Sequence, residues 1–393
     1  MRALGLSHAI AVVDWSAAGG APRGSHRQAA ARAQRFALLA RESAAAGART
    51  VLLAHHVGDN VETLLSVFAR CSGLRGLRGI ERSAAFGELR VVRPLLSVSK
   101  ERLRATCVAR GVEYVTDPSN FSPEYDRVRV RTAVARMSAG RGPSVEALVR
   151  VMAGARALVG DLDAEARALA ATALTRHDIC GFALLRPAAL LPSAVPGVVA
   201  RWLLRDILRY YGGQEFGASE GVVNRVYKAI ALGSPSVGIA LGGCVLRPHG
   251  APLRNGALDA SVLLLCREPG VVGAGARAPP TVLVPDVRVL WDRRFAITMR
   301  VDSGAPAPPP QLVVSAFSEP LRRALRASRH GCDMDARASM PHNVKVGLPA
   351  VCTGGPDGRL VALPHYGYCS LPGVRFETRF APLFTMGART HAQ

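Results

Sequence analysis

The sequence predicts an α/β protein, and two patterns of apolar residues carry that prediction. In the first 140 residues, short apolar runs that suit buried strands alternate with longer helical stretches. Such alternation favours a parallel sheet covered by helices. Beyond about residue 236, short apolar runs follow one another between glycines and prolines, which is typical of strands joined by turns.

The N-terminal region contains two expected strands, His8–Val13 and Thr50–His55. The expected helices are His26–Ala46, Asn60–Arg70 and Lys100–Arg110. Ser99 precedes the last of them and is a good N-cap residue.

The rest of the chain changes character along its length. Residues 144–232 are predicted to be helical, with Val199, Leu203, Ile207 and Tyr210 on one helix face. The strand-like segments that follow are Val237–Leu246, Ser261–Cys266, Val287–Leu290 and Phe295–Val301, and the linker-like segments are Gly270–Pro280 and Gly304–Pro310. We therefore expect three domains: residues 1–140, a helical and then strand-rich region at 141–270, and a small α+β domain at 271–393.

The charge balance favours partners that carry phosphates. The 393 residues have a formal net charge of +21 and a pI of about 10.9. A basic protein gains affinity for polyanions, because each neutralised phosphate releases counterions. RNA is favoured over a membrane surface, since no long helix has a basic face opposite an apolar one. Nearly all of the positive charge comes from arginine, and alanine is also in excess. The alternative explanation is a GC-rich genome, which raises the pI without selection for binding.

Two other features exclude classes of protein. No uncharged apolar run reaches the roughly 18 residues of a membrane span, and the first residues lack a signal-peptide pattern, so we expect a cytoplasmic protein. None of the eight cysteines lies in a C-x-x-C pair or at zinc-finger spacing from histidines. This disfavours a zinc or iron–sulfur site and predicts small buried thiols.

The stretch with the clearest chemistry is Ala54–Leu65, where an expected strand ends and a helix begins. His55 and His56 lie at the carboxyl end of the strand, which is the sheet edge where ligands bind in open α/β folds. Asp59, Glu62 and Thr63 follow at helical spacing and share one face, and they suit a magnesium–nucleotide site. Alternatively, Asp59 is the helix N-cap with Glu62 as its capping-box partner, and the histidines are ordinary strand-end residues.

Two basic stretches follow. Arg70–Gly79 holds three glycines and three arginines, which suits either a loop around a phosphate or RNA or a plain turn after a helix. Asp117–Asn120 is a turn former. Arg127, Arg129 and Arg131 alternate after it and suit either phosphate binding or a solvated basic face.

The motifs HHVGDNVETLL, RCSGLRGLRGI, VRPLL, DPSN and DRVRVR occur in this order, with Lys100 between the third and the fourth. Together they resemble the HHxxDxxET element, the RGSGxxGLxGM loop and the following elements of the tRNA(Ile)-lysidine synthetases, a family of PP-loop ATP pyrophosphatases. The resemblance is dense from about Leu4 to Ala135. It is thinner at Gly242-Gly243, Leu290–Phe295 and Leu363–Tyr368.

This resemblance implies a Rossmann-like PP-loop ATPase domain and an ATP-dependent ligase. ATP adenylates the C2 oxygen of the wobble cytidine in tRNA(Ile) with a CAU anticodon, and the ε-amine of free L-lysine then displaces AMP. The residues implied in the ATP–Mg²⁺ and reaction pocket are His55, His56, Asp59, Glu62 and Thr63, with Asp59 and Glu62 toward the nucleotide and Asp59 as the Mg²⁺ ligand. Those implied near the target base are Ser72, Gly73 and Arg75, and those implied in support of the pocket are Asp117, Asn120, Arg127 and Arg131.

The sequence also departs from the family pattern. The SGGxDS loop that holds ATP phosphates in the family has no counterpart in the printed residues, so we expect an N-terminally truncated, incomplete PP-loop domain that binds ATP poorly as printed. Gly58, Cys71 and Val128 replace residues common in the family. The alternative function is a non-catalytic tRNA-binding remnant of the enzyme. A tRNA thiolase of the same superfamily is disfavoured by the lack of C-x-x-C pairs. For the assembly, the resemblance suggests a homodimer.

Overall fold

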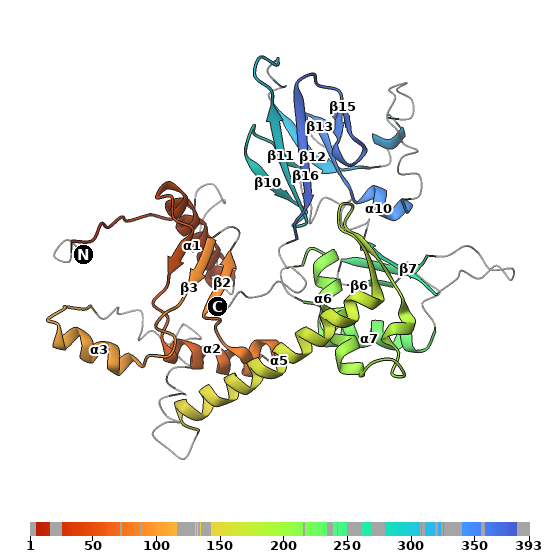
Figure 1. Ribbon diagram of the computed structural model, residues 1–393. Helices are drawn as coiled ribbons and strands as arrows, with labels where there is room; N and C mark the ends of the chain where they lie inside the picture. Colours follow the sequence, from red (N-terminus) through yellow and green to blue (C-terminus); the bar gives the residue numbers. More distant parts are fainter. Residues whose placement is uncertain are drawn as a thin grey trace. The chain divides into compact units, whose positions relative to one another are not determined.

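A computed structural model describes residues 5–15, 26–70, 73–86, 89–115, 130, 132, 134, 143–214, 217–233, 239–241, 243–249, 261–268, 280–306, 308, 311–318, 321–323, 325, 340–354 and 358–382. These residues form two compact units (Figure 1). Unit 1 comprises the described residues up to Gly160, and unit 2 those from Asp161. The boundary falls within helix α5 (Val145–Ala173).

Unit 1 contains a small sheet with helices around it. Its strand order is β1 (Thr50–Leu52), β3 (Leu89–Val92) and β2 (Ser83–Phe86), with β1 and β3 parallel and β2 antiparallel to β3. The helices are α1 (His26–Ala45), α2 (Val57–Ala69), α3 (Lys100–Ala109) and the 3₁₀ helix η3 (Leu74–Arg78). Val61 and Leu64 of α2 pack against Met152 of α5 in the core. The expected α/β character is confirmed.

The expected strand at His8–Val13 is wrong. Residues 6–15 form no regular element, and Ile10 and Val12 are 82% and 80% exposed. An isolated strand is not stable without a ladder of hydrogen bonds to a neighbour, and among the described strands none pairs with this segment.

Unit 2 begins with a region that we call the middle half (residues 161–268). Its antiparallel sheet has the order β4 (Leu174–His177), β5 (Phe182–Leu185), β8 (Leu263–Arg267), β7 (Cys244–Pro248) and β6 (Ile239–Leu241). The helices are η5 (Pro187–Leu190), α6 (Gly197–Tyr211) and α7 (Glu220–Ala231). Val199, Leu203, Ile207 and Tyr210 are buried on α6, as expected. The β4–β5 hairpin interrupts the stretch that was expected to be helical throughout.

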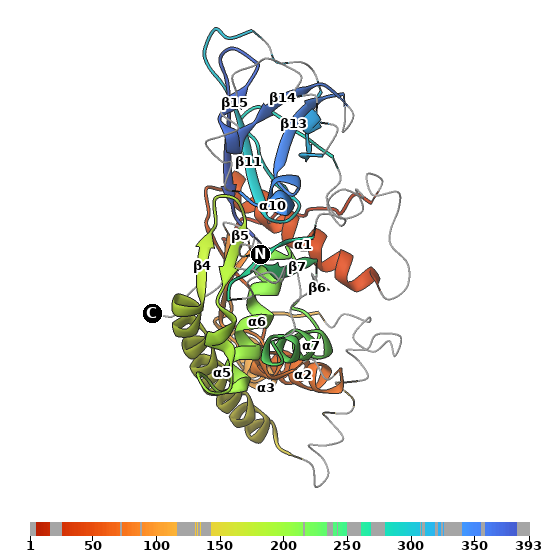
Figure 2. The same cartoon turned by 90° about the vertical axis from the view of Figure 1, so that its right-hand side faces the viewer.

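The C-terminal half of unit 2 (residues 280–382) is built from two antiparallel sheets (Figures 1 and 2). One has the order β10 (Arg288–Trp291), β11 (Phe295–Val301) and β16 (Val374–Phe380). The other has the order β15 (Tyr368–Cys369), β14 (Leu360–Leu363), β13 (Pro349–Thr353), β12 (Leu312–Ala316) and β9 (Thr281–Val282). Helices α10 (His342–Val346) and η6 (Pro364–Tyr366) complete it. The expected strand at Phe295–Val301 is confirmed to the residue, whereas residues 270–279 of the expected linker lie outside the described part.

The buried thiols expected from composition are found at four of the six described cysteines. Cys180, Cys244, Cys266 and Cys352 are buried free thiols, whereas Cys107 is half-buried and Cys369 is exposed. Burial raises the pKa of both Cys244 and Cys266 to about 12, so neither is a reactive thiolate. None of the described helices combines the length and the apolar character that crossing a membrane would need.

Candidate functional site

The carboxyl ends of β1 and β3 meet at one edge of the unit 1 sheet. The backbone N–H of Leu53 donates to Val92 O at 2.8 Å and holds the two strand ends together. Val57 N donates to Val98 O at 3.0 Å, so α2 begins beside the segment that leads into α3. Figure 1 shows α2 and α3 at the same end of the sheet. Two helix N-termini therefore open at the edge where α/β folds bind ligands, and their partial positive charge favours anions there.

His56 and Asp59 cap the start of α2. His56 is the N-cap: its Nδ1 accepts from Gly58 N at 3.0 Å, and its own backbone N–H donates to Asp59 Oδ2 at 2.9 Å. The interpretation of Asp59 as the N-cap with Glu62 as its partner is therefore wrong, because the helix begins at Val57 and Asp59 is itself the capping-box partner.

The cap also orients the imidazole of His56. Because Nδ1 accepts from Gly58, the neutral ring carries its proton on Nε2. That nitrogen lies 3.6 Å from Asp59 Oδ2, and the Asp59 side chain is 15% exposed. The Nε2–H group and the carboxylate thus lie together at the mouth of the helix.

The other expected pocket residues lie on the same helix or just before it. Glu62 is buried. Thr63 donates its hydroxyl to Asp59 O at 2.8 Å, a bond within the helix. His55 is half-buried at the end of the strand segment. The structure thus gathers His55, His56, Asp59, Glu62 and Thr63 at the start of α2, and their roles stay a prediction.

The donor set limits the kind of metal ion that this edge can hold. Within the described residues, no three His, Cys, Asp or Glu side chains lie close enough together to bind a metal ion. Mg²⁺ in nucleotide sites is commonly held by one or two carboxylates together with phosphates and water. Asp59 fits that arrangement, and an all-protein metal cage is not present in the described part.

The Arg70–Gly79 loop folds back along α2. Its exit is fixed by Asn60 Oδ1, which accepts from Ile80 N at 2.7 Å. A side chain at Gly76 would collide with Val67, and one at Gly79, which has a φ of 70°, would collide with Asn60. Gly76 is therefore explained by the close approach of the loop to the helix, and Gly79 both by that approach and by its left-handed backbone at the end of η3.

The described part of this loop presents Gly73 and half-buried Arg75. Arg78 donates to Arg75 O at 3.2 Å and lies 3.4 Å from Glu81, so it stabilises the loop internally. Ser72, Asp117, Asn120, Arg127 and Arg131 lie outside the described residues.

Glu101 and Arg93 are two neighbours of the site that sequence reasoning missed. The pKa of Glu101 lies below its ordinary value, because its own backbone N–H and the Ser99 hydroxyl donate to it, with weaker help from Arg104 and His56. Ser99 caps α3 as expected, accepting from Arg102 N at 3.3 Å. Arg93 is buried directly after β3 and donates to Glu81 O at 2.8 Å. Arg93 could have been found from the sequence, because it directly follows an apolar strand at the sheet edge where ligands bind.

The chain is similar to known proteins at two levels: its N-terminal part matches a domain family, and more than half of its length matches individual proteins. Residues 2–138 match the PP-loop domain family. The chain is 34% identical over 229 residues to the tRNA(Ile)-lysidine synthase of Salinispora arenicola, covering 55% of this chain and 65% of that protein. It is 31% identical over 295 residues to the tRNA(Ile)-lysidine synthase of Ruegeria pomeroyi, covering 75% of this chain and 63% of that protein. The matches thus span just under two thirds of these two relatives.

A third relative is matched over more of its length. The tRNA(Ile)-lysidine synthase of Methylobacterium nodulans is 35% identical over 258 residues, which is 64% of this chain and 73% of that protein. Among the motifs that carried the resemblance, HHVGDNVETLL leads from the carboxyl end of β1 into α2, and VRPLL begins at the last residue of β3. Both lie inside the matched PP-loop domain. The chain belongs to the tRNA(Ile)-lysidine synthase family.

Proposed function

We propose that this protein joins L-lysine to C2 of the wobble cytidine in tRNA(Ile) with a CAU anticodon, using ATP. One observation carries the proposal: the capped start of α2, with His56 and Asp59 beside the start of α3, lies at the ligand edge of a PP-loop domain. The names of the relatives support the choice of tRNA and product.

ATP supplies the adenylyl group that turns the cytosine C2 oxygen into a leaving group, and Mg²⁺ neutralises charge on the phosphates. In the proposal, the partial positive charge at the starts of α2 and α3 faces the departing pyrophosphate. His56 donates through Nε2, since its Nδ1 is occupied by Gly58 N. Asp59 carries the negative charge that faces Mg²⁺, and Glu62, His55 and Thr63 line the same helix start.

The proposal assigns the remaining residues by region. Residues 1–140 hold ATP and the target base, with Ser72, Gly73 and Arg75 next to the base and Asp117, Asn120, Arg127 and Arg131 behind the pocket. The basic regions 141–270 and 271–393 hold the body of the tRNA, free lysine is the amine donor, and the cytoplasm is the location. The net charge of +21 supports the contacts to tRNA phosphates.

Incorporation of labelled lysine tests the reaction. The 393-residue chain and the product of the longest reading frame that contains it are each incubated with ATP, Mg²⁺, radiolabelled lysine and a tRNA transcript. We expect label in tRNA(Ile) and none in an initiator-type tRNA(Met), which shares the CAU anticodon. If both proteins bind tRNA in a salt-dependent manner and neither incorporates lysine, the non-catalytic remnant replaces this proposal.

Substitution of Asp59 tests its proposed role. Asp59→Asn keeps an oxygen that can accept from His56 N and removes the charge, so the stability of α2 should hardly change. Lysine incorporation should fall by orders of magnitude, because charge stabilisation by a metal is worth several kcal/mol in the transition state. Wild-type incorporation by Asp59→Asn would leave Asp59 as a helix cap alone.

A further inference from the structure

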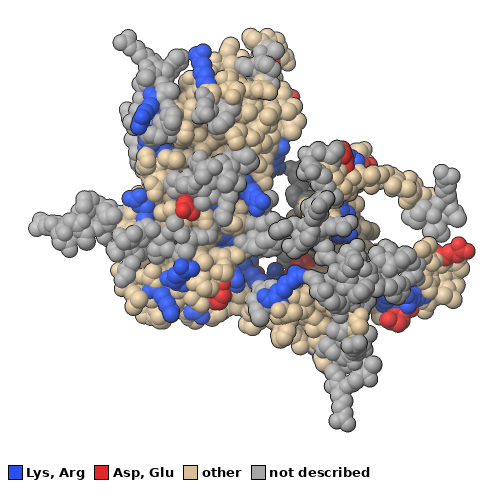
Figure 3. All heavy atoms as spheres, turned by 180° about the vertical axis from the view of Figure 1, so that it is seen from behind, with Lys and Arg blue, Asp and Glu red and all other residues tan. Residues whose placement is uncertain are grey.

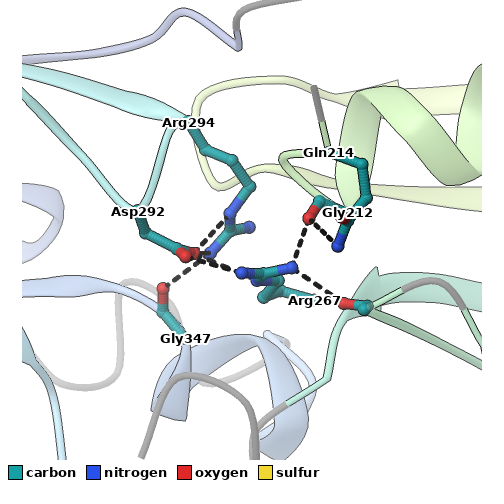
Figure 4. Close-up of polar contacts among 7 residues, drawn as sticks. Gly212, Gln214, Arg267, Asp292, Arg294 and Gly347 are labelled. Carbon is teal, nitrogen blue, oxygen red and sulfur yellow. Dashed lines mark hydrogen bonds and ion pairs between the residues drawn. The ribbon is translucent and has the colours of Figure 1, made fainter. Parts of the chain in front are cut away.

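Three charged side chains of unit 2 that the proposed reaction does not use meet at one buried place (Figure 4). Arg267, at the end of β8, donates from Nη2 to Asp292 Oδ1 at 2.7 Å and from Nε to Asp292 Oδ2 at 3.1 Å. Arg294 donates from Nε to Asp292 Oδ2 at 2.7 Å. The three side chains are 4%, 0% and 2% exposed. We call them the buried charge cluster.

The buried charge cluster crosses from one half of unit 2 to the other. Arg267 belongs to the middle half and also donates to the carbonyl oxygens of Gly212 and Gly243, both of that half. Asp292 and Arg294 belong to the C-terminal half, where Arg294 donates to Gly347 O at 3.3 Å. Gly243 and the Leu290–Phe295 segment, which are far apart in sequence, therefore meet at this joint.

Apolar packing already holds the two halves together beside the cluster. The ring of Phe380 in the C-terminal half lies 5.3 Å from that of Tyr210 and 5.9 Å from that of Tyr211, both on α6. A side chain at Gly181, which has a φ of 68°, would collide with Phe380. His365 Nε2 lies 2.8 Å from Ile179 O. Adhesion between the halves therefore does not require buried charges.

The buried charge cluster is costly in two ways. Two guanidinium groups share one carboxylate, and all three side chains are almost fully buried. Burial lowers the pKa of Arg294, opposed by Asp292. Asp292 and Arg293 also adopt left-handed backbone, with φ of 48° and 55°, in a turn where Arg294 N donates to Trp291 O at 3.1 Å. Such a turn favours Asn-Gly or Asp-Gly. Asp292 therefore suits the turn, whereas Arg293 stands at a position where glycine is favoured and carries backbone strain.

We infer that the buried charge cluster is an orientation lock. Forked bonds from Arg267 to Asp292 are directional in a way that apolar contacts are not, and they fix the angle between the two halves. The inference rests on the proposed function, in which both halves hold one tRNA. Exposed arginines occur in both halves, namely Arg225 and Arg247 in the middle half and Arg288, Arg375 and Arg379 in the C-terminal half. Figure 3 shows that Lys and Arg side chains are more frequent than Asp and Glu on the face it draws.

The functional consequence is a matter of effective concentration. Two binding surfaces held at a fixed angle engage one RNA together, so the second contact is intramolecular. When the angle varies, the two surfaces match the RNA only part of the time, and the affinity for tRNA falls although no RNA-contacting residue is lost. Asp292 and Arg267 are thus positioning residues for tRNA.

The test replaces the guanidinium group of Arg267 by one that keeps the positive charge but cannot make both bonds to Asp292. Arg267→Lys retains a cation but removes the paired bonds to Asp292. The matched control is Arg300→Lys, since Arg300 also bonds an aspartate in left-handed backbone, Asp286, at 2.8 Å, but in an exposed pair. A second variant, R267M/D292G/R294M, removes all three charges. Its glycine at position 292 suits the left-handed backbone of the turn.

Two readouts are measured on the full chain. The first is the distance distribution between dyes attached, through azide-bearing amino acids, at exposed Leu232 in the middle half and exposed Val282 in the C-terminal half. The second is the dissociation constant for tRNA(Ile). We expect a narrow distribution in the wild type and in Arg300→Lys, a broad one in Arg267→Lys and in the triple variant, and a loss of tRNA affinity of tenfold or more in the latter two.

A narrow distribution with wild-type affinity in either folded cluster variant overturns the lock, and so does unfolding of both, which would make the cluster a stabilising feature alone. If Arg267→Lys does not fold, the triple variant decides. Failure of the wild type to bind tRNA would contradict the proposed function instead, and the distance distributions would still judge the lock by themselves.

Discussion

Asp59 in unit 1 and Asp292 in unit 2 each accept hydrogen bonds where an element begins or turns, but their surroundings differ. Asp59 accepts one backbone N–H, lies beside an imidazole and keeps 15% of its side chain exposed. Asp292 is fully buried between two guanidinium groups. Asp59, which we propose faces Mg²⁺, thus stays partly exposed at an edge, whereas Asp292, to which we assign a positioning role, is surrounded by charged donors. Substitutions of these two aspartates test the contrast directly.

The largest effect is expected at the buried carboxylate. Asp292→Ala leaves two buried guanidinium groups without their partner, and we expect unit 2 to lose about 3–5 kcal/mol of stability. The measurement is urea unfolding followed by the fluorescence of Trp202 and Trp291, both in unit 2. The control Asp286→Ala removes an exposed pair at a similar φ and should cost far less. Equal losses in the two variants would contradict the contrast.

The next effect concerns the loop that folds along α2. In Gly76→Ala the new methyl group meets Val67, and we expect a loss of about 1–3 kcal/mol from overpacking. Gly154→Ala, inside α5 with open space around the added atom, should instead stabilise the protein by about 0.5–1 kcal/mol. Thermal melting of both variants decides, and shifts of the same sign would refute the packing account.

A smaller effect is expected at the partly exposed carboxylate, Asp59. Asp59→Ala removes the acceptor for His56 N and should cost about 0.5–2 kcal/mol, in the range of other lost caps. The loss should be local, so hydrogen exchange of the His56 amide should accelerate while that of amides in unit 2 stays unchanged. Unchanged protection of the His56 amide would show that the capping box does not stabilise the helix start.

The smallest effect is a pH dependence at the start of α3. The folded-state pKa of Glu101 is depressed, mainly by the bond from its own backbone N–H. The ionised group therefore contributes stability above its unfolded pKa of about 4.3, and this contribution is lost as the pH falls through the lower folded value. Glu101→Gln should melt slightly lower than the wild type at pH 7, and the difference should vanish in strong acid. Glu113→Gln, outside any helix, is the control; a difference that grows in acid would reverse the sign and refute the assignment.

Much of the fold could be predicted where local signals decide it. The limits of α1 and α3 were expected to within one residue, because Ser99 is a strong cap and the surrounding residues favour helix. The buried face of α6 was predicted from the helical spacing of its apolar residues. The start of α2 was placed three residues late, because its cap is a histidine, which lies outside the usual cap residues.

Long-range features could not be predicted from local patterns. Residues 8–13 have the composition of a strand, but strand formation depends on a partner that composition does not reveal. Arg267 and Asp292 are separated by 25 residues, and only the packing of the two halves brings them together. At the candidate site, the spacing of Asp59, Glu62 and Thr63 predicted their shared helix face, while the role of Asn60 depends on a contact with a distant segment.

The return path of the Arg70–Gly79 loop has a mechanical consequence. Because Asn60 Oδ1 accepts from Ile80 N, the far end of the loop is tied to the first turn of α2, one residue from Asp59. Gly76 rests against Val67 in the last turn of the helix. The loop is therefore braced against the helix at two points. In the proposed function, where Gly73 lies next to the target base, a displacement of the loop by bound RNA would be transmitted to the Ile80–Asn60 hydrogen bond and so to the first turn of α2.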